Sequence, residues 1–308
     1  MTNWRRPTRW WAELLLLGLV YGAYSGGRLL ARGDVQLAVD HGLAILRFER
    51  GLSIDFESPL NRLFSTHAWL GIPADFVYAS LHYLVTPAVL IWVYHRRPER
   101  YRTARTWLVS STLLGLVGFA LVPTCPPRLL HLAHGFTDTM AQYSAYGWWG
   151  AEASAPRGLG SFTNQYAAMP SLHVGWALWC GVLLWRYGRH PLLRVLGAAY
   201  PLLTTLVVMG TANHYFLDAV AGAGVMGVGF LIALGVERLA GRRSAAAAAA
   251  AAPATATPVA SAASAATAPG AGFRRKSTIV SGGWETSAGE LLPAQRPPAA
   301  DDAPATAR

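Results

Sequence analysis

Six long apolar runs limit what this chain can fold into. They cover residues 10–30, 69–94, 106–122, 171–187, 192–210 and 214–236. A helix of about 20 apolar residues crosses the hydrocarbon core of a bilayer, and each run is close to that length. The sequence therefore predicts an all-α, polytopic membrane protein with six transmembrane helices.

The composition supports this prediction. Of the 308 residues, 53% are hydrophobic and only 14% are charged, which leaves too little polar surface to cover a soluble globule of this size. The net charge of +10 at pH 7 comes almost entirely from arginines, many of which lie between the apolar runs. Arginines in such links determine the orientation of the spans and bind anionic lipid headgroups. We therefore expect these charges to face a membrane and not a nucleic acid.

The arginines also predict the orientation of the chain. With six crossings, the N-terminus, the links near 95–105 and 186–194, and everything after residue 237 lie on one side and carry most of the arginines. The positive-inside rule makes that side cytoplasmic, which predicts a multi-pass plasma-membrane protein with both termini in the cytoplasm. A cleaved signal peptide is the alternative for the first run, because small residues near Ala23 loosely fit a cleavage site. An uncut anchor is favoured, since further spans follow.

Two segments, 31–68 and 244–308, do not fit the transmembrane pattern. The first is amphipathic and mixed in charge, which predicts an interfacial helix with Glu49 and Glu57 as solvated or interfacial carboxylates, and with a functional role for them as the alternative. The second is poly-alanine followed by Ala, Pro, Thr, Ser and Gly, and it cannot bury enough apolar surface to offset its chain entropy. We expect a membrane domain over residues 1–243 and a disordered cytoplasmic tail over 244–308.

Aromatic side chains gather between the third and fourth runs, at Tyr143, Tyr146, Trp148 and Trp149. Amphipathic rings suit the headgroup layer, so they predict an interfacial belt, with a lid over a site as the alternative. His131 and His134 in the same segment have a spacing seen in metal sites. Because no cysteine or second acidic cluster accompanies them, we expect no metal and no other cofactor.

His214 and Asp218 stand at the mouth of the last apolar run, in the stretch NHYFLD at 213–218. A helix brings residues i and i+4 onto one face about 6 Å apart, so Asp218 can accept a hydrogen bond from one imidazole nitrogen of His214. The other nitrogen is then left as a base or nucleophile. A helix-capping carboxylate beside a surface histidine is the alternative, but ionisable groups at the end of a span are costly and usually functional.

A second stretch, MPSLH at 169–173, opens the fourth run in the same manner. The helices that begin near Ser171 and His214 are separated by one span, so their N-termini emerge on the same face of the membrane. Arg128 follows the third span on that face. We therefore expect the rings of His173 and His214 to lie within about 10 Å of each other at the extracytoplasmic boundary, with Arg128 nearby.

Each of these groups suits a phosphate. Two helix N-termini offer unpaired N–H groups, and Ser171 and Asn213 are good N-cap residues. Arg128 supplies a planar fork for two phosphate oxygens. His214 would attack phosphorus in line while His173 protonates the departing oxygen, and water or an alcohol would then discharge the phosphohistidine.

The two stretches resemble the second and third signature motifs of the type 2 phosphatidic acid phosphatase superfamily. The stretch CPPRLL at 125–130, and Leu172 in place of the usual glycine, look more like its inositol phosphorylceramide synthase branch. The chain departs from the phosphatases at Leu121, where their first motif has lysine. It departs again at Val207 and Val208, where their third motif has Ser-Arg. The site thus has fewer cationic side chains to bind a phosphate than the phosphatases have, which favours a transferase or a phosphodiester substrate.

The resemblance covers roughly residues 69–237, and it implies that His214 is the nucleophile, His173 the acid and Asp218 the orienting group. We expect an enzyme that transfers a phosphoryl or phospho-headgroup unit from a phospholipid or polyprenyl phosphate. A lipid phosphate phosphatase is the alternative among metal-independent enzymes. Two further alternatives are a metal-dependent hydrolase that uses the same three side chains as ligands and a non-catalytic transporter or lipid-binding protein.

Overall fold

The computed structural model describes residues 9–30, 34–149, 157 and 164–250, and the regular structure in these residues is helical apart from isolated β-bridge positions, which include the pair Thr124 and Ala167. The predicted all-α class is confirmed. The longer elements are α1 (Trp10–Leu30), α2 (Val35–Gly51), α3 (Glu57–Thr66), α4 (Ala68–Phe76), α5 (His82–Arg96), α6 (Pro98–Leu121), α8 (Leu172–Tyr187), α9 (Pro191–Gly210) and α10 (Phe216–Ala250). The shorter ones are a π-helical turn, η1 (Val77–Leu81), the helix α7 (Thr139–Gln142), and the 3-10 turns Pro127–Leu129, Leu132–His134 and Ser144–Tyr146.

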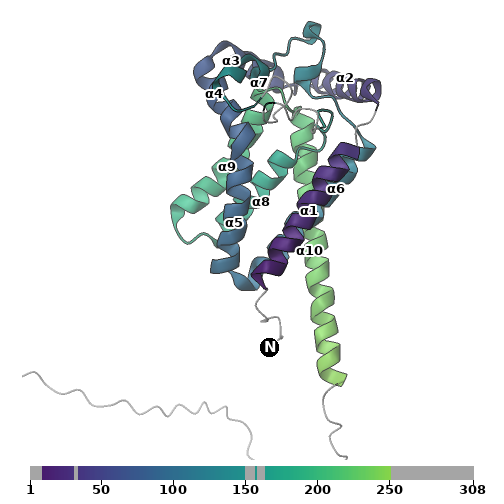
Figure 1. Ribbon diagram of the computed structural model, residues 1–308, viewed down its shortest axis with the longest axis vertical. Helices are drawn as coiled ribbons and strands as arrows, with labels where there is room; N and C mark the ends of the chain where they lie inside the picture. The colour runs from purple at the N-terminus through teal and green to yellow at the C-terminus, as the bar shows by residue number, and fades with distance from the viewer. Residues whose placement is uncertain (1–8, 31–33, 150–156, 158–163, 251–308) are drawn as a thin grey trace, which may run out of the picture. The chain divides into compact units, whose positions relative to one another are not determined.

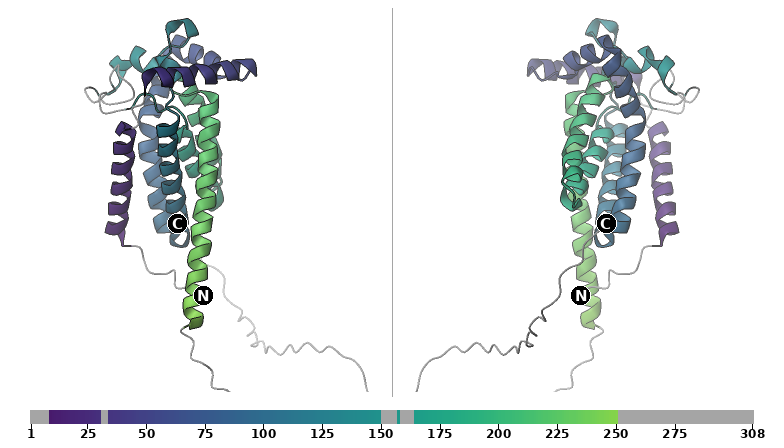
Figure 2. Two further views of the ribbon diagram at one scale, coloured as in Figure 1. Left: turned by 90° about the vertical axis from the view of Figure 1, so that its right-hand side faces the viewer. Right: turned by 90° about the vertical axis from the view of Figure 1, so that its left-hand side faces the viewer.

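The long helices form a bundle, and α2, α3 and α7 gather at one end of it (Figure 1). Helix α8 packs against α5, α6, α9 and α10, so it takes a central position. Helix α10 continues past the other helices at the opposite end, as both views of Figure 2 show. The N-termini of α8 and α10 point toward the end where α2 and α3 lie (Figure 1).

Four helical stretches of the described chain are long and apolar enough to cross a membrane: Ala68–Arg96, Pro98–Leu121, Pro191–Gly210 and Phe216–Ala250. The six predicted crossings are therefore not shown. Helix α8 has 16 residues, which at 1.5 Å each is about 24 Å and less than the ~30 Å core of a bilayer. It is short because it begins only after the cap at Ser171. The apolar part of α1, Trp10–Ala23, is also shorter than the four.

Helix α1 is attached to α6 by a polar contact inside the bundle. The Glu13 carboxylate is buried, accepts a hydrogen bond from Tyr101 Oη at 3.0 Å and pairs with the Arg105 guanidinium. A carboxylate within an apolar helix needs such partners, because an unpaired buried charge is strongly unfavourable. The pair therefore fixes the position of α1 on α6.

The segment predicted as one interfacial helix forms two, α2 and α3. Helix α2 lies across the end of the bundle (Figure 2) and buries one face, formed by Ala38, Gly42, Leu46 and Glu49. A Cβ atom at Gly42 would lie 2.6 Å from the carbonyl oxygen of Cys125, so only glycine allows this close approach. Glu49 and Glu57 are both 0% exposed, and the prediction that they are solvated is wrong. Each lies on the packed face of its helix and not on the outer one.

The aromatic segment between α6 and α8 is partly packed inside the molecule. Trp149 is 0% exposed, donates from Nε1 to the Met140 carbonyl at 2.9 Å and packs against Phe76 of α4. It is therefore a core residue, whereas Trp148 and Tyr146 remain exposed, as an interfacial belt requires. Residues 150–156 and 158–163 lie outside the described residues.

Helix α10 runs through residues 244–250, which we expected to belong to the tail. Alanine has the highest intrinsic helix propensity, so the poly-alanine stretch continues a helix that already exists. The rest of the predicted tail, residues 251–308, lies outside the described residues.

Candidate active site

The NHYFLD stretch places a histidine–aspartate pair at the start of α10. His214 Nδ1 donates to Asp218 Oδ2 at 3.3 Å, and the same oxygen accepts from the Tyr215 backbone N–H at 3.0 Å. Both side chains are buried, with His214 4% and Asp218 0% exposed. The backbone N–H groups of Asn213 and His214 both donate to the Val208 carbonyl, which fixes the turn before the helix. With Nδ1 held by the carboxylate, Nε2 is the nitrogen that can meet a substrate.

A main-chain hydrogen bond joins the two motifs. Ser171 caps α8 by accepting from the Val174 N–H, and its own N–H donates to the Asp218 carbonyl at 2.9 Å. Helices α8 and α10 can approach this closely because residue 222 is glycine. A Cβ atom there would collide with the Ser171 carbonyl oxygen.

This packing brings the two predicted histidines together. The ring centroids of His173 and His214 lie 5.9 Å apart, inclined at 59°. A single phosphorus atom between two such rings can be within reach of both, because reacting atoms come to about 3–3.5 Å. The separation lies inside the limit of about 10 Å that we set from the sequence.

Two side chains that the sequence analysis did not select hold the His173 ring. Tyr78 stacks on it at 4.5 Å between centroids, and His82 meets it edge-on at 4.4 Å. Tyr78 lies in the π-helical turn η1 and His82 begins α5, so the turn presents both residues to α8. The signal in the sequence was a histidine within an apolar run, where polar groups are expensive and usually functional.

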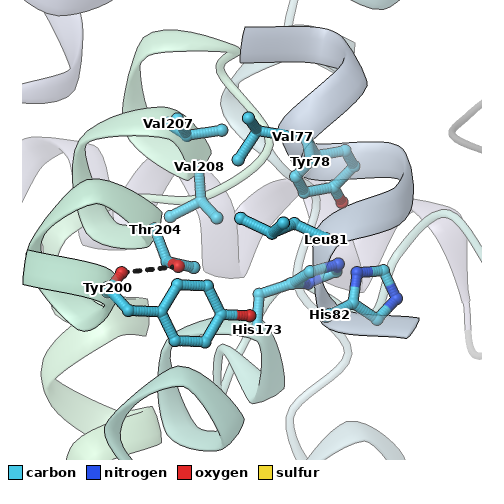
Figure 3. A pocket seen from close by; sticks show the side chains of 9 residues that line it. All are labelled: Val77, Tyr78, Leu81, His82, His173, Tyr200, Thr204, Val207 and Val208. Atoms are coloured by element: carbon cyan, nitrogen blue, oxygen red, sulfur yellow. Dashed lines mark hydrogen bonds between the residues drawn. The ribbon is translucent and has the colours of Figure 1, made fainter. Parts of the chain in front are cut away.

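A small pocket opens beside these rings (Figure 3). Its lining consists of Val77, Tyr78, Leu81, His82, His173, Tyr200, Thr204, Val207 and Val208. The Thr204 hydroxyl is used within α9, where it donates to the Tyr200 carbonyl at 2.9 Å. The wall formed by Val207 and Val208 is apolar, so the positions where the phosphatases have Ser-Arg offer no charge here.

Arg128 reaches this region through Asn213, the neighbour of His214. Its Nε donates to Asn213 Oδ1 at 2.9 Å, and its Nη1 pairs with Asp138 Oδ2 at 2.9 Å. The guanidinium is therefore buried beside the site, but Asp138 shares its charge. Asp138 was not selected from the sequence, because nothing in the spacing of a loop carboxylate indicates a partner ten positions earlier.

Two predicted details are wrong. Asn213 does not cap α10, because its side chain bonds Arg128 and the Thr211 hydroxyl. The N-terminus of α10 is also not open to an anion, since the Leu217 N–H donates to Glu49 Oε1 at 2.7 Å and the Tyr215 N–H to Asp218. Carboxylates of the protein already occupy the place that we expected a phosphate to take.

Among the residues that the structure describes, no three His, Cys, Asp or Glu side chains form a group that could hold a metal ion. The His131 ring instead accepts a hydrogen bond from the Ala133 N–H in a tight turn.

A helical membrane bundle with a buried His–Asp pair facing a second histidine defines the class of membrane phosphatases and phosphotransferases. Comparison with known families agrees, because the PAP2 superfamily model matches residues 43–232, which is more than half of the chain. The chain belongs to the PAP2 superfamily and is a multi-pass membrane enzyme; such enzymes are typically metal-independent and act on lipid phosphates. No curated protein and no solved structure matches it.

The contact between α8 and α10 gives a first testable prediction. Gly222→Ala should lower the free energy of unfolding by about 1–3 kcal/mol and turnover by about 10-fold or more, because the new methyl group pushes Ser171 and His173 away from His214. Thermal unfolding in detergent and a lipid turnover assay measure the two effects. Gly224→Ala on the same helix is the matched control, since a Cβ atom there meets nothing within 4 Å. Equal behaviour of the two variants would contradict the prediction.

The stacking of Tyr78 on His173 gives a second testable prediction. Tyr78→Ala removes the ring that orients the imidazole and should lower kcat about 10-fold, in keeping with the 0.5–1.5 kcal/mol of an aromatic pair. Tyr78→Phe keeps the ring and should stay within about 3-fold of the wild type. Steady-state kinetics on the same lipid substrate test both, and a Tyr78→Ala enzyme as fast as Tyr78→Phe would show that the stack has no role.

Proposed function

We propose that this protein transfers a phosphoryl or phospho-headgroup unit from a lipid through a phosphohistidine on His214. The observation that carries the proposal is the arrangement around His214: Asp218 binds its Nδ1 at 3.3 Å, and the centroid of the His173 ring lies 5.9 Å from that of His214. This arrangement supports His214 as the nucleophile and His173 as the acid.

The reaction proceeds in two steps. The Nε2 lone pair of His214 forms a bond to phosphorus, the bond from phosphorus to the leaving oxygen breaks, and His173 gives its proton to that oxygen. In the second step an acceptor hydroxyl gives its proton to His173 and attacks phosphorus. The bond between nitrogen and phosphorus then breaks, and its electron pair returns to His214. Asp218 stabilises the positive imidazole ring in the first step.

The charge of the site favours a phosphodiester donor and an alcohol acceptor. The charge of Arg128 is shared with Asp138, and Val207 and Val208 form an apolar wall. A phosphodiester carries one negative charge, whereas a phosphomonoester carries up to two and needs more cationic partners. These features support a phospholipid substrate and the inositol phosphorylceramide synthase-like branch over hydrolysis of a lipid phosphate or polyprenyl phosphate. Ser171 and Asn213 remain proposed substrate-side groups beside Arg128.

We also propose that α1 and α8 complete six crossings, with both termini cytoplasmic and the site facing outward. The excess of arginine on the predicted cytoplasmic links supports this orientation. This orientation can be tested with cysteines introduced at two exposed positions. Leu132 lies on the same side as the candidate site, and Glu99 lies on the proposed cytoplasmic side. In intact cells a membrane-impermeant thiol reagent should label the first and spare the second, and the reverse pattern would overturn the orientation.

The deciding experiment uses purified protein and a panel of phospholipids with a labelled headgroup, with and without an alcohol acceptor. Label that moves onto the acceptor supports a transferase, and phosphate released into water supports the phosphatase alternative. Vanadate should block either reaction as a mimic of five-coordinate phosphorus, and chelators should leave it intact. Activity lost in a chelator and restored by zinc would contradict the proposal, and so would the absence of turnover with every lipid, which a transporter would give.

A further inference from the structure

Two buried carboxyl groups from outside the catalytic motifs meet at the start of α10. Glu49 from α2 and Glu57 from α3 are both 0% exposed and are close neighbours, and Glu49 Oε2 and both Glu57 oxygens accept no hydrogen bond from the described residues. Glu49 Oε1 accepts from the Leu217 N–H at 2.7 Å, and Glu57 faces the Phe216 N–H. With Asp218 on the Tyr215 N–H, two N–H groups at this end bind carboxyl oxygens, and a third carboxyl, that of Glu57, faces the N–H between them.

This arrangement requires a proton. The groups that face the pair include Asp55, Asp218 and the buried Tyr215 hydroxyl, none of which is a cation. Burial raises the pKa of Glu49 from its ordinary value of 4.5 to about 9, and burial also raises the pKa of Glu57. Two carboxyls this close cannot both ionise readily, so at neutral pH one proton lies between them.

We propose that Glu49 and Glu57 form a proton-sharing carboxyl pair that positions His214 by holding the first turn of α10 between α2 and α3. For its effect on catalysis this inference rests on the proposed function. Leu217, which Glu49 binds, and Phe216, which Glu57 faces, follow His214 almost directly in the chain. A shift of this turn therefore moves the nucleophile relative to phosphorus.

Neighbouring contacts explain why the turn depends on the pair. The Tyr215 hydroxyl donates to the Cys125 carbonyl at 3.0 Å, and the Phe216 ring packs edge-on against Phe56 at 5.1 Å. These contacts hold the side chains, whereas the Leu217 N–H, which lies in the first turn and has no helical acceptor, is satisfied by Glu49. Neither glutamate lines the pocket beside His173, so we assign both as positioning residues.

The first test separates positioning from simple loss of a side chain. Glu49→Ala should lower kcat about 10- to 100-fold with little change in KM, since a displacement near 1 Å can cost up to about 100-fold. Glu49→Gln keeps an acceptor oxygen for Leu217 and gives an N–H to Glu57, so it should stay within about 3-fold of the wild type at pH 7. Glu99→Ala, at an exposed glutamate, is the matched control and should have no effect.

The second test does not depend on turnover. Hydrogen exchange of the backbone amides at 215–218 should be at least about 10-fold faster in Glu49→Ala than in the wild type, because opening of this turn is no longer opposed by the carboxyl. The same amides in Glu49→Gln and Glu99→Ala should exchange as in the wild type. If Glu49→Ala folds poorly, the exchange rates of Glu49→Gln can be compared with those of the wild type across pH instead.

The pH dependence has a defined sign. A carboxyl with a raised pKa in the folded protein stabilises the fold fully below its ordinary value of 4.5, and this contribution is lost as the pH rises through about 9. Wild-type kcat and amide protection at 215–218 should therefore fall together at alkaline pH. Glu49→Gln cannot lose this proton and should keep both.

The outcomes distinguish this inference from the proposed function. If the wild type turns over no lipid, the proposed function fails, and the exchange data still decide whether the pair holds the turn. If the wild type is active but Glu49→Ala matches it in kcat and exchange, the inference is wrong. An alkaline loss of protection that persists in Glu49→Gln would also overturn it.

Discussion

Replacing His214 by alanine is expected to lower lipid turnover at least about 10³-fold and to abolish labelling of the protein by a substrate with radioactive phosphorus. The reason is that His214 Nε2 is the atom proposed to form the bond to phosphorus, and the ring is oriented by the contact of Nδ1 with Asp218 at 3.3 Å. The measurement is turnover of the phospholipid that proves active, together with the acid-labile phosphoryl label that remains after denaturation.

The matched control is His95→Ala, which removes an exposed histidine at the end of α5 and should keep full activity and labelling. A labelled His214→Ala protein would show that the covalent intermediate lies elsewhere. Full loss of activity with normal labelling of the variant would place His214 in the second step only.

The second large effect concerns His173 and depends on the leaving group. His173→Ala should lower turnover of a natural phospholipid about 10²- to 10⁴-fold, because the departing alkoxide is no longer protonated. With a nitrophenyl phosphodiester the leaving group needs no proton, so the first step should persist. The second step still lacks its base, and the phosphohistidine should therefore accumulate.

Pre-steady-state release of nitrophenol measures this accumulation. The variant should give a burst close to one nitrophenol per active protein followed by slow turnover, whereas the wild type turns over steadily. A variant that is equally slow with both leaving groups and shows no burst would mean that His173 supports the pocket but transfers no proton.

The contact between His214 and Asp218 in the candidate site could be predicted from the sequence because each motif is local. The spacing of His214 and Asp218 predicts a contact that depends on one helix turn, and the structure places their atoms 3.3 Å apart. The meeting of His173 with His214 followed from counting crossings. That count assumed six spans, whereas the described chain shows four helices long and apolar enough to cross a membrane. The two histidines still meet, because α8 and α10 both begin at the same end of the bundle (Figure 1).

The supporting residues could not be predicted because their partners are distant in the sequence. Glu49 binds Leu217, 168 positions later, and amphipathic periodicity alone cannot distinguish a carboxylate on the packed face from one on the wet face. His82 and Asp138 were missed for the same reason: each acquires its role only when another helix or loop packs against it. The π-helical turn that presents Tyr78 has no readable sequence signature.

The all-α class and the positions of the long helices were predicted, but the extension of α10 to residue 250 and the break between α2 and α3 were not. Apolar composition marks where helices lie, but the start of α8 is set by the cap at Ser171 and by its contact with α10. Helix α8 packs centrally against four neighbours, so it does not need the full thickness of a bilayer to bury its apolar surface. The break between α2 and α3 follows from a turn with Ser53 at a positive φ of 57°, which no residue type in that segment demands.

The bond from the Ser171 N–H to the Asp218 carbonyl involves no side chain. Every amino acid except proline carries that donor, and every amino acid carries that acceptor. A substitution at position 171 by any residue except proline therefore keeps this main-chain link between α8 and α10, even where the side-chain cap of α8 is lost.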